Sequence, residues 1–285
     1  MPEARSRPAR HGSPTMFTQY VVQWDLIPDG NPIVTHSSRL LPVRQRGVPA
    51  MLKIAQEDEE RAGGRLMVWW NGIGAARVLA HDGDALLLAR ADGPRSLVEM
   101  AHDGQDDEAT RILCSAAARL HQPRDPLLTG PELPELVPLD RWFRSLWPAA
   151  QQHGGLLAQC AEAARGLLAT PQDVVVLHGD IHHGNVLDFG ARGWLAIDPK
   201  GLHGERGFDY ANIFCNPDRD TALVPGRFEQ RVNRVVQEAG LGRRRLLQWI
   251  LAWSGLSAAW ILETGETPDV DYDIARLAMA ALLCE

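Results

Sequence analysis

The sequence predicts an α+β protein of two lobes, a small β-rich N-terminal lobe followed by a larger, mainly helical C-terminal lobe. The chain has 285 residues, which is enough for one large domain or for two lobes with a cleft between them. Hydrophobic residues make up 45% and charged residues 23%, which excludes a fibrous or wholly disordered chain. Strand-like patterns fill the first third, helix-like patterns fill the rest, and turn residues at 91–94 separate them.

We therefore expect three segments. Residues 1–15 are rich in arginine and proline and lack an apolar run, which indicates a disordered leader and not a signal peptide. Residues 16–92 form the N-terminal lobe and residues 93–285 the C-terminal lobe. Ligands usually bind in clefts between such lobes.

The N-terminal lobe is predicted from short apolar runs. Residues 17–55 are interpreted as strands, with the clearest apolar and β-branched runs at 17–24 and 50–54. Charged and then apolar residues at 56–68 predict a helix. Two further apolar runs, at 76–80 and 85–89, flank His81-Asp82-Gly83-Asp84, which is typical of a hairpin turn.

The C-terminal lobe is predicted to be helical. Apolar residues recur with a 3.6-residue period in 108–121, and 139–147, 156–168 and the chain from residue 228 onward have similar patterns. Residues 246–262 carry no charge and could be mistaken for a membrane span. The segment is short for a span and contains polar residues, so we interpret it as a buried helix and expect no membrane partner.

Charge and cysteine content narrow the function classes. Acidic residues number 36 and basic residues 29, which gives a net charge of −7; this disfavours general nucleic-acid binding and favours a cationic ligand. The four cysteines form no CxxC pair, which indicates a reducing cytoplasm and neither a disulfide framework nor a cysteine zinc site.

One segment carries the chemistry. A β-rich run at 174–177 leads into His178-Gly179-Asp180, and Asn185 and Asp198 follow. The offset of five from Asp180 to Asn185 is that between the base and the metal-binding asparagine of kinase catalytic loops. Such an arrangement supplies a base for a hydroxyl and two magnesium ligands, which points to phosphoryl transfer.

Two neighbouring patterns look like metal-binding motifs, but we interpret neither as one. Asp188-Phe189-Gly190 has the letters of a kinase metal-binding motif, but it lies too close to Asn185 and is rich in turn residues. We therefore expect Asp188 to be a hairpin-turn residue whose replacement by alanine is nearly silent. His178 and His182 have the spacing of a helical zinc site, but the glycines around them argue against a helix, so zinc is not expected.

These motifs resemble those of a known family. His178-Gly179-Asp180, Ile197-Asp198-Pro199 and the GFDYAN segment at 207–212 look like the aminoglycoside phosphotransferases. WWNGIGAARVL at 69–79 and LSAAW at 256–260 are most similar to the aminoglycoside/hydroxyurea resistance kinases, in particular their streptomycin 6-kinase-like members. The resemblance runs from about residue 51 to about residue 260 and implies a bilobal protein-kinase-like fold.

The resemblance implies roles for the catalytic segment in the C-terminal lobe. Asp180 corresponds to the catalytic aspartate that orients the acceptor hydroxyl and takes its proton. Asn185 and Asp198 correspond to ligands of Mg²⁺. Asp209 corresponds to a buried aspartate that braces the catalytic loop, and His178 is expected to brace it too.

The resemblance also implies an ATP site in the N-terminal lobe. Lys53 corresponds to the strand lysine that contacts the ATP phosphates, with Glu60 as its partner and Glu57 as the alternative. Ser37 and Ser38 lie where a glycine-rich loop would cover the nucleotide, although no such glycine motif is present. Backbone groups near residue 91, with Ala91 as the assigned residue, would bind adenine.

The expected function is ATP-dependent transfer of the γ-phosphoryl group to a hydroxyl of a streptomycin-type aminoglycoside, by a cytoplasmic monomer or weak dimer. One alternative is a kinase of another small metabolite, such as a sugar, an aminocyclitol or hydroxyurea. The other is a non-catalytic, pseudokinase-like binding protein. Acidic residues at 263–273 either attract the ammonium groups of an acceptor or form a solvated tail.

Overall fold

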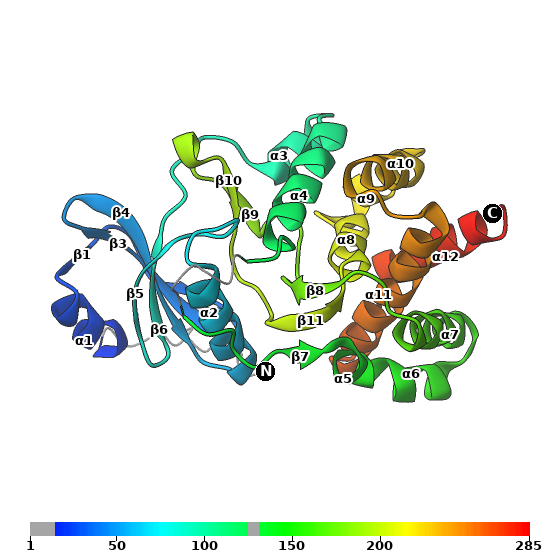
Figure 1. The fold of residues 1–285 in the computed structure, drawn as a ribbon, viewed down its shortest axis with the longest axis horizontal. Coiled ribbons are helices and arrows are strands. Elements are labelled where there is room, and N and C mark those ends of the chain that lie inside the picture. Colours follow the sequence, from blue (N-terminus) through cyan, green and yellow to red (C-terminus); the bar gives the residue numbers. More distant parts are fainter. Residues whose placement is uncertain (1–14, 125–130) are drawn as a thin grey trace, which may run out of the picture. The chain divides into compact units, whose positions relative to one another are not determined.

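The computed structural model describes residues 15–124 and 131–285, so the expected leader lies outside the described residues except for Thr15. The chain forms two compact units. The first comprises the described residues up to Arg61 together with Val78–Arg90, and the second comprises Ala62–Arg77 and Ala91–Glu285. Because Figure 1 does not fix the relative placement of the parts, each unit is described by itself.

The first unit is built on a six-stranded antiparallel sheet with the order β1-β3-β4-β6-β5, in which β2 also pairs with β3. Apolar side chains of β3, β4 and β6, such as Val43, Leu52 and Leu87, are fully buried and form its core. The hairpin predicted at 76–89 is present as β5 and β6. The strands are β1 (Leu26–Pro28), β2 (Ile33–Val34), β3 (Ser38–Gln45), β4 (Val48–Ala55), β5 (Val78–Asp82) and β6 (Ala85–Ala89).

Of residues 17–24, predicted as a strand, 17–23 instead belong to helix α1 (Thr15–Gln23) and Trp24 lies in the turn that follows it. The prediction was wrong because it weighted the β-branched pair at 21–22 over the spacing of the apolar residues. Phe17, Tyr20, Val21 and Trp24 follow one another at helical intervals of three and four residues. Phe17 is buried in the core of the sheet and the other three pack against that core.

Helix α2 (Asp58–Trp70) agrees with the helix predicted at 56–68, and the division between the two units falls within it. Three acidic residues in its first turn, at 58–60, interact favourably with the positive end of the helix dipole. Two adjacent glycines at 63–64 weaken the helix intrinsically. A Cβ atom on Gly63 would lie 1.9 Å from the carbonyl oxygen of Pro199, so close packing requires glycine there.

The second unit is mainly helical, as predicted. The helix predicted at 139–147 is divided into α5, a 3-10 turn at Phe143–Ser145 and α6, whereas those predicted at 108–121 and 156–168 are continuous. The helices are α3 (Leu97–His102), α4 (Asp106–Leu120), α5 (Leu139–Trp142), α6 (Leu146–His153), α7 (Gly155–Ala169), α8 (Gly207–Ala211), α9 (Arg219–Ala222), α10 (Arg227–Ala239), α11 (Arg243–Glu263) and α12 (Asp269–Leu282).

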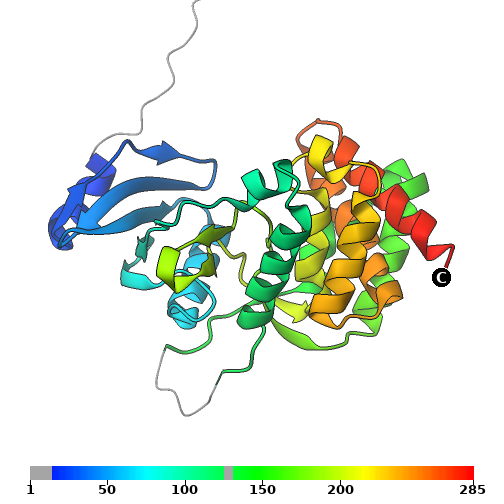
Figure 2. The same cartoon turned by 90° about the horizontal axis from the view of Figure 1, so that it is seen from above.

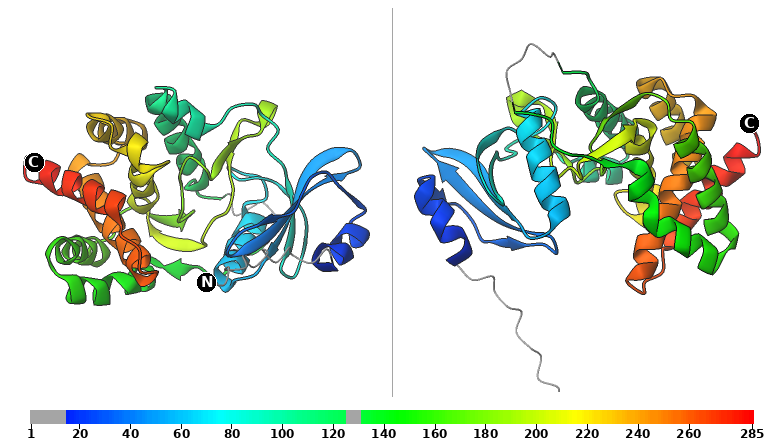
Figure 3. Two further views of the ribbon diagram at one scale, coloured as in Figure 1. Left: turned by 180° about the vertical axis from the view of Figure 1, so that it is seen from behind. Right: turned by 60° about the horizontal axis from the view of Figure 1, so that its bottom comes forward.

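Helix α11 is the core of this unit. Among the described residues it is the one helix long and apolar enough to cross a membrane, and 67% of its apolar window is buried. It lies beside α7 and α12, as the views in Figure 3 show. A Cβ atom on Gly255 would lie 2.2 Å from the Cβ of Cys160, so this glycine allows α11 to approach α7 closely.

Two small β-structures carry the segment that holds the sequence motifs. β8 (Val174–Leu177) pairs with β11 (Leu202–Glu205), which also pairs with β7 (Val137–Pro138). β9 (Val186–Asp188) and β10 (Trp194–Ala196) form an antiparallel hairpin with Val186 opposite Ala196. Helices α4 and α10 pack side by side in the same unit (Figure 2). The ends of β8, β9 and β10 position the candidate active site.

Candidate active site

The catalytic-loop segment begins where β8 ends, and a buried aspartate holds its backbone. Asp209 Oδ2 accepts hydrogen bonds from His178 N (2.9 Å) and His121 Nε2 (2.8 Å), and its Oδ1 accepts one from Gly179 N (2.7 Å). Burial raises the pKa of Asp209, but the hydrogen bond from His121 and nearby charges outweigh it, so the pKa lies below its usual value. The predicted brace is confirmed.

His178 braces the loop from its other side. Its Nε2 lies 2.8 Å from the carbonyl oxygen of Ile197, and its Nδ1 accepts a hydrogen bond from Asp180 N (3.2 Å). Because the first partner can only accept and the second can only donate, the ring carries its proton on Nε2. Burial lowers the pKa of His178, so the ring is neutral, and it stacks on Trp70 with ring centres 6.1 Å apart.

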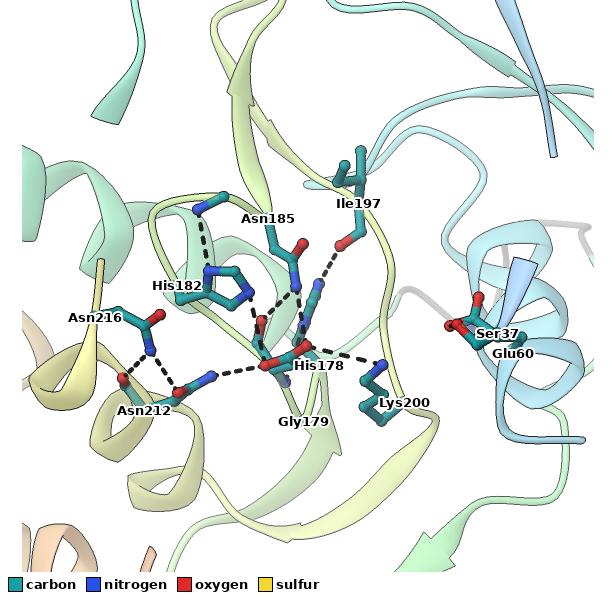
Figure 4. Close-up of polar contacts among 12 residues, drawn as sticks. Ser37, Glu60, His178, Gly179, His182, Asn185, Ile197, Lys200, Asn212 and Asn216 are labelled. Carbon is teal, nitrogen blue, oxygen red and sulfur yellow. Dashed lines mark hydrogen bonds and ion pairs between the residues drawn. The ribbon is translucent and has the colours of Figure 1, made fainter. Parts of the chain in front are cut away.

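The carboxylate of Asp180 is held by amides on both oxygens (Figure 4). Oδ2 accepts a hydrogen bond from Asn185 Nδ2 (3.1 Å), which also donates to the Asp180 carbonyl oxygen (2.9 Å), and Oδ1 accepts one from Asn212 Nδ2 (2.8 Å). Lys200 Nζ lies 3.8 Å from Oδ2, and His182 Nε2 lies 3.8 Å from Oδ1. The carboxylate is therefore fixed in orientation and faces a lysine.

Asn185 and Asp198 are brought together by the β9–β10 hairpin. Both partners of the Asn185 amide nitrogen are acceptor oxygens of Asp180, so the side-chain Oδ1 of Asn185 points away from Asp180. Ile197 N donates to the carbonyl oxygen of Asn185 (2.9 Å), which places Asp198 beside Asn185. Asp198 has a φ of 64°, in the left-handed region that few non-glycine residues occupy.

Of the remaining loop histidines, His183 is buried and His182 is half-buried, and both are neutral. Gly184 N donates to His182 Nδ1 (3.1 Å), and burial lowers the pKa of His182. Burial lowers the pKa of His183 to about 3. Among the side chains that the structure describes, no three His, Cys, Asp or Glu residues are arranged to hold a metal ion.

The first unit contains the predicted lysine and glutamate. Lys53 lies on β4, opposite Leu40 of β3 and Leu86 of β6. It forms an ion pair with Glu60, which is buried in the first turn of α2 and accepts a hydrogen bond from Ser37 Oγ (3.0 Å). The loop between β4 and α2 is short, yet it brings these three side chains together.

The other residues predicted for the nucleotide site are Ser38, Glu57 and Ala91, and each lies at a different place in the fold. Ser38 is buried at the start of β3, and its Oγ lies 3.0 Å from the Oγ1 of Thr35. Glu57 immediately precedes α2, and the ion pair of Lys53 is with Glu60 instead. Ala91 is the first residue of the second unit after β6.

Asp188 lies at the corner of the β9–β10 hairpin, as the sequence predicts. It is 3% exposed, and its carboxylate accepts hydrogen bonds from Arg95 Nε (2.9 Å) and Gly190 N (3.0 Å). The Arg95 hydrogen bond holds the pKa of Asp188 below its usual value. A Cβ atom on Gly93 would lie 2.2 Å from Asp188 Cγ. Asp188 therefore supports the fold, so its replacement is expected to lower stability, and the expectation that turnover hardly changes stays a prediction.

Sequence reasoning missed two residues that contact Asp180. Asn212 was part of the GFDYAN segment but had no role assigned. Lys200 had no motif of its own, and its place two residues after Asp198 was the one available signal. Both contacts depend on how separate strands and helices meet at the loop, which spacing along the chain does not reveal.

An antiparallel sheet with a lysine paired to a buried glutamate, joined to a helical unit with an Asp–Asn–Asp segment, defines the protein-kinase-like fold. The solved structure of aminoglycoside phosphotransferase APH(3'')-Id from Streptomyces rimosus has this fold. It is similar to this chain with a TM-score of 0.59 at 19% identity, covering 85% of this chain and 97% of that one. This similarity concerns the fold alone.

The chain belongs to the aminoglycoside/hydroxyurea antibiotic resistance kinase family, which it matches over residues 23–265. It is 54% identical to the streptomycin 3''-kinase of Klebsiella pneumoniae, covering 92% of this chain and 99% of that protein. It is 32% identical to the streptomycin 6-kinase of Streptomyces griseus, covering 93% of this chain and 88% of that protein. The family expected from the motifs is confirmed, whereas the 6-kinase type is not.

Proposed function

We propose that this protein is an ATP-dependent kinase that transfers the γ-phosphoryl group to a hydroxyl of streptomycin, with the 3''-hydroxyl as the favoured acceptor. The observation that carries the proposal is the carboxylate of Asp180, held on both oxygens by amides at the end of a kinase-like loop. The choice of acceptor is supported by the 54% identity to the streptomycin 3''-kinase. The 6-hydroxyl is the second candidate because the 32% relative is named a streptomycin 6-kinase.

Asp180 accepts the proton of the attacking hydroxyl in this proposal. General-base catalysis requires a carboxylate within hydrogen-bonding reach of the hydroxyl, held at a fixed angle. Asn185 donates one hydrogen bond to Oδ2 of Asp180, and Asn212 donates one to Oδ1. Each oxygen keeps a second lone pair that could accept a hydrogen bond from the hydroxyl of the acceptor. Lys200 lies 3.8 Å from Oδ2 and adds positive charge where the phosphoryl oxygens gather negative charge.

Asn185 and Asp198 would hold Mg²⁺. The Oδ1 of Asn185 is turned away from Asp180, and Asp198 follows the residue that is hydrogen-bonded to the Asn185 backbone, so an amide and a carboxylate lie on neighbouring segments of the backbone. Magnesium prefers such oxygen ligands and keeps several waters. When bound, it neutralises charge on the ATP phosphates.

The first unit would bind ATP. Lys53 would contact the phosphates, and the buried carboxylate of Glu60 would hold the lysine in position. Ser37, hydrogen-bonded to Glu60, would lie at the phosphate end, with Ser38 next to it. Backbone groups near Ala91, which begins the second unit after β6, would bind adenine. The net charge of −7 would attract a cationic antibiotic at low ionic strength.

The test is to incubate the purified protein with ATP, Mg²⁺ and streptomycin and to follow the product by mass spectrometry. Phosphorus–proton NMR correlation then identifies the phosphorylated hydroxyl as 3'' or 6. Asp180→Asn is the matched inactive control. Absence of a phosphorylated product from the wild type would overturn the streptomycin assignment. A parallel panel of sugars, aminocyclitols and hydroxyurea separates another kinase from a protein that turns over no ATP at all.

A further inference from the structure

We propose that Asn212 is a positioning residue that fixes the Asp180 carboxylate, and that Asn216 and the buried Arg231 hold Asn212 in the required orientation. This inference deepens the proposed function, because it rests on Asp180 being the group that accepts the proton. Its evidence is a continuous set of hydrogen bonds within the second unit. Asn216 and Arg231 have no role in the nucleotide, metal or proton-transfer steps described above, and Asn212 enters them only as a hydrogen-bond donor to the carboxylate.

The first link is between Asn212 and the carboxylate. Asn212 begins the 3-10 turn Asn212–Cys215 that follows α8, and it is 3% exposed. Its Nδ2 donates to Asp180 Oδ1 (2.8 Å). Figure 4 labels Asn212 and marks its contacts with dashed lines. Since Asn185 donates to Oδ2, two amides from separate elements restrain rotation of the carboxylate.

The second link fixes which end of the Asn212 amide faces Asp180. Asn216 Nδ2 donates to the side-chain Oδ1 of Asn212 (2.9 Å) and to its carbonyl oxygen (2.9 Å) (Figure 4). An amide flipped by 180° would place its oxygen against the carboxylate and its nitrogen against the Asn216 donor. Both contacts would be repulsive, so Asn216 selects the donating orientation.

The third link is the side chain of Arg231 on α10, which is only 1% exposed. Its Nη1 donates to the carbonyl oxygens of Ile213 (2.8 Å) and Asn216 (2.7 Å) and so closes the turn that carries both asparagines. Asp106 at the start of α4 accepts hydrogen bonds from Arg231 Nε (3.0 Å) and Nη2 (2.6 Å), and it neutralises the buried charge.

This arrangement has a specific kinetic consequence. A buried ion pair such as Arg231–Asp106 contributes little to stability by itself compared with apolar packing, so its hydrogen bonds to the turn are the informative feature. The relay of hydrogen bonds from Arg231 through Asn216 and Asn212 fixes the angle of the Asp180 carboxylate and does not form a binding surface. Its loss should therefore lower kcat, while the KM values for ATP and for the acceptor change little.

The kinetic experiment compares Asn212→Ala, Asn212→Ser and Asn216→Ala with Asn233→Ala, an exposed asparagine of α10 that contacts Arg243. We expect Asn212→Ala to lower kcat by about 10- to 100-fold, as for a misplaced catalytic group, with KM values within about threefold of wild type. Asn216→Ala should show a smaller loss of kcat in the same direction, and Asn233→Ala should behave as wild type. Wild-type kcat in Asn212→Ala, or a loss that lies in KM, would overturn the proposal.

A second readout does not depend on activity or on the identity of the acceptor. The side-chain amide resonances of Asn212, assigned by NMR from the Asn212→Ser spectrum, should shift in Asp180→Ala, whereas those of Asn233 should not. Unshifted Asn212 resonances would overturn the relay even in an active enzyme. If the wild type does not phosphorylate streptomycin, the proposed function fails, and the NMR comparison still decides whether Asn212 is bound to Asp180.

Discussion

The substitution Asp188→Ala tests whether this carboxylate supports the fold or binds metal. The carboxylate is buried and accepts hydrogen bonds from Gly190 N and Arg95 Nε. Arg95 is more than half exposed, so water screens its contribution, and the hydrogen bond from the Gly190 amide adds to it. A hydrogen bond to a charged group contributes about 1.5–3 kcal/mol. We expect a loss of about 2 kcal/mol in the free energy of unfolding, or about 4–8 °C in Tm.

The assay measures thermal denaturation and initial rates well below the melting temperature. Asp188→Ala should lower Tm but keep kcat within about twofold, because the side chain does not face the reacting groups. Asp198→Ala should do the opposite, with Tm nearly unchanged and Mg²⁺-dependent turnover lower by about 100-fold or more. Loss of turnover in Asp188→Ala at an unchanged Tm would refute the assignment of metal binding to Asp198.

A double-mutant cycle with Gly93 isolates the local packing. A Cβ atom at residue 93 would lie 2.2 Å from Asp188 Cγ, so Gly93→Ala should destabilise the wild type. In the Asp188→Ala background the clash is removed, and the second substitution should cost little. Strict additivity of the two losses would show that the two residues do not share this contact.

Three further outcomes follow from the site and the core. Lys200→Met should lower kcat by about 10- to 100-fold, and Lys200→Arg should retain more activity because the positive charge near Asp180 remains; equal losses in both would contradict a charge effect. Glu205→Gln should lower Tm by about 4–10 °C, because the buried carboxylate accepts hydrogen bonds from Arg245 and Trp249. Burial raises the pKa of Glu205, yet these hydrogen bonds hold the pKa below its usual value. The ionised carboxylate therefore stabilises the fold above the ordinary glutamate pKa, and this stabilisation is lost as the pH falls through the pKa of the folded state. Glu205→Gln should accordingly show a shallower acid dependence of Tm than the wild type. Asp209→Asn should reduce both Tm and kcat, because an amide cannot accept the hydrogen bonds of the loop on both sides; wild-type values for both would disprove the brace.

The contact between Asp180 and Asn185 could be predicted from the sequence because the catalytic segment is local. Asp180, Asn185 and Asp198 lie within one strand–loop–hairpin unit, so their spacing along the chain largely determines their spacing in space. The pair of Lys53 and Glu60 could be expected for the same reason, since a strand and the following helix bring them together.

The features that sequence reasoning missed depend on contacts between distant elements. Asn212 reaches Asp180 from a turn 32 residues further along the chain, and Arg231 reaches that turn from α10. The burial of Asp188 depends on the segment around Gly93, which lies far away in sequence. Helix α1 was missed for another reason, because its β-branched residues masked a helical spacing that becomes decisive when the sheet offers an apolar surface.

The unusual backbone of Asp198 has a consequence for protein engineering. A non-glycine residue in the left-handed region costs about 1–2 kcal/mol relative to glycine. Glycine at this position would relieve the backbone strain but would also remove the carboxylate and, given its proposed role, would abolish turnover. A library selected for thermal stability alone does not select for this aspartate, so the screen has to include the proposed kinase activity, which keeps the strained residue in place.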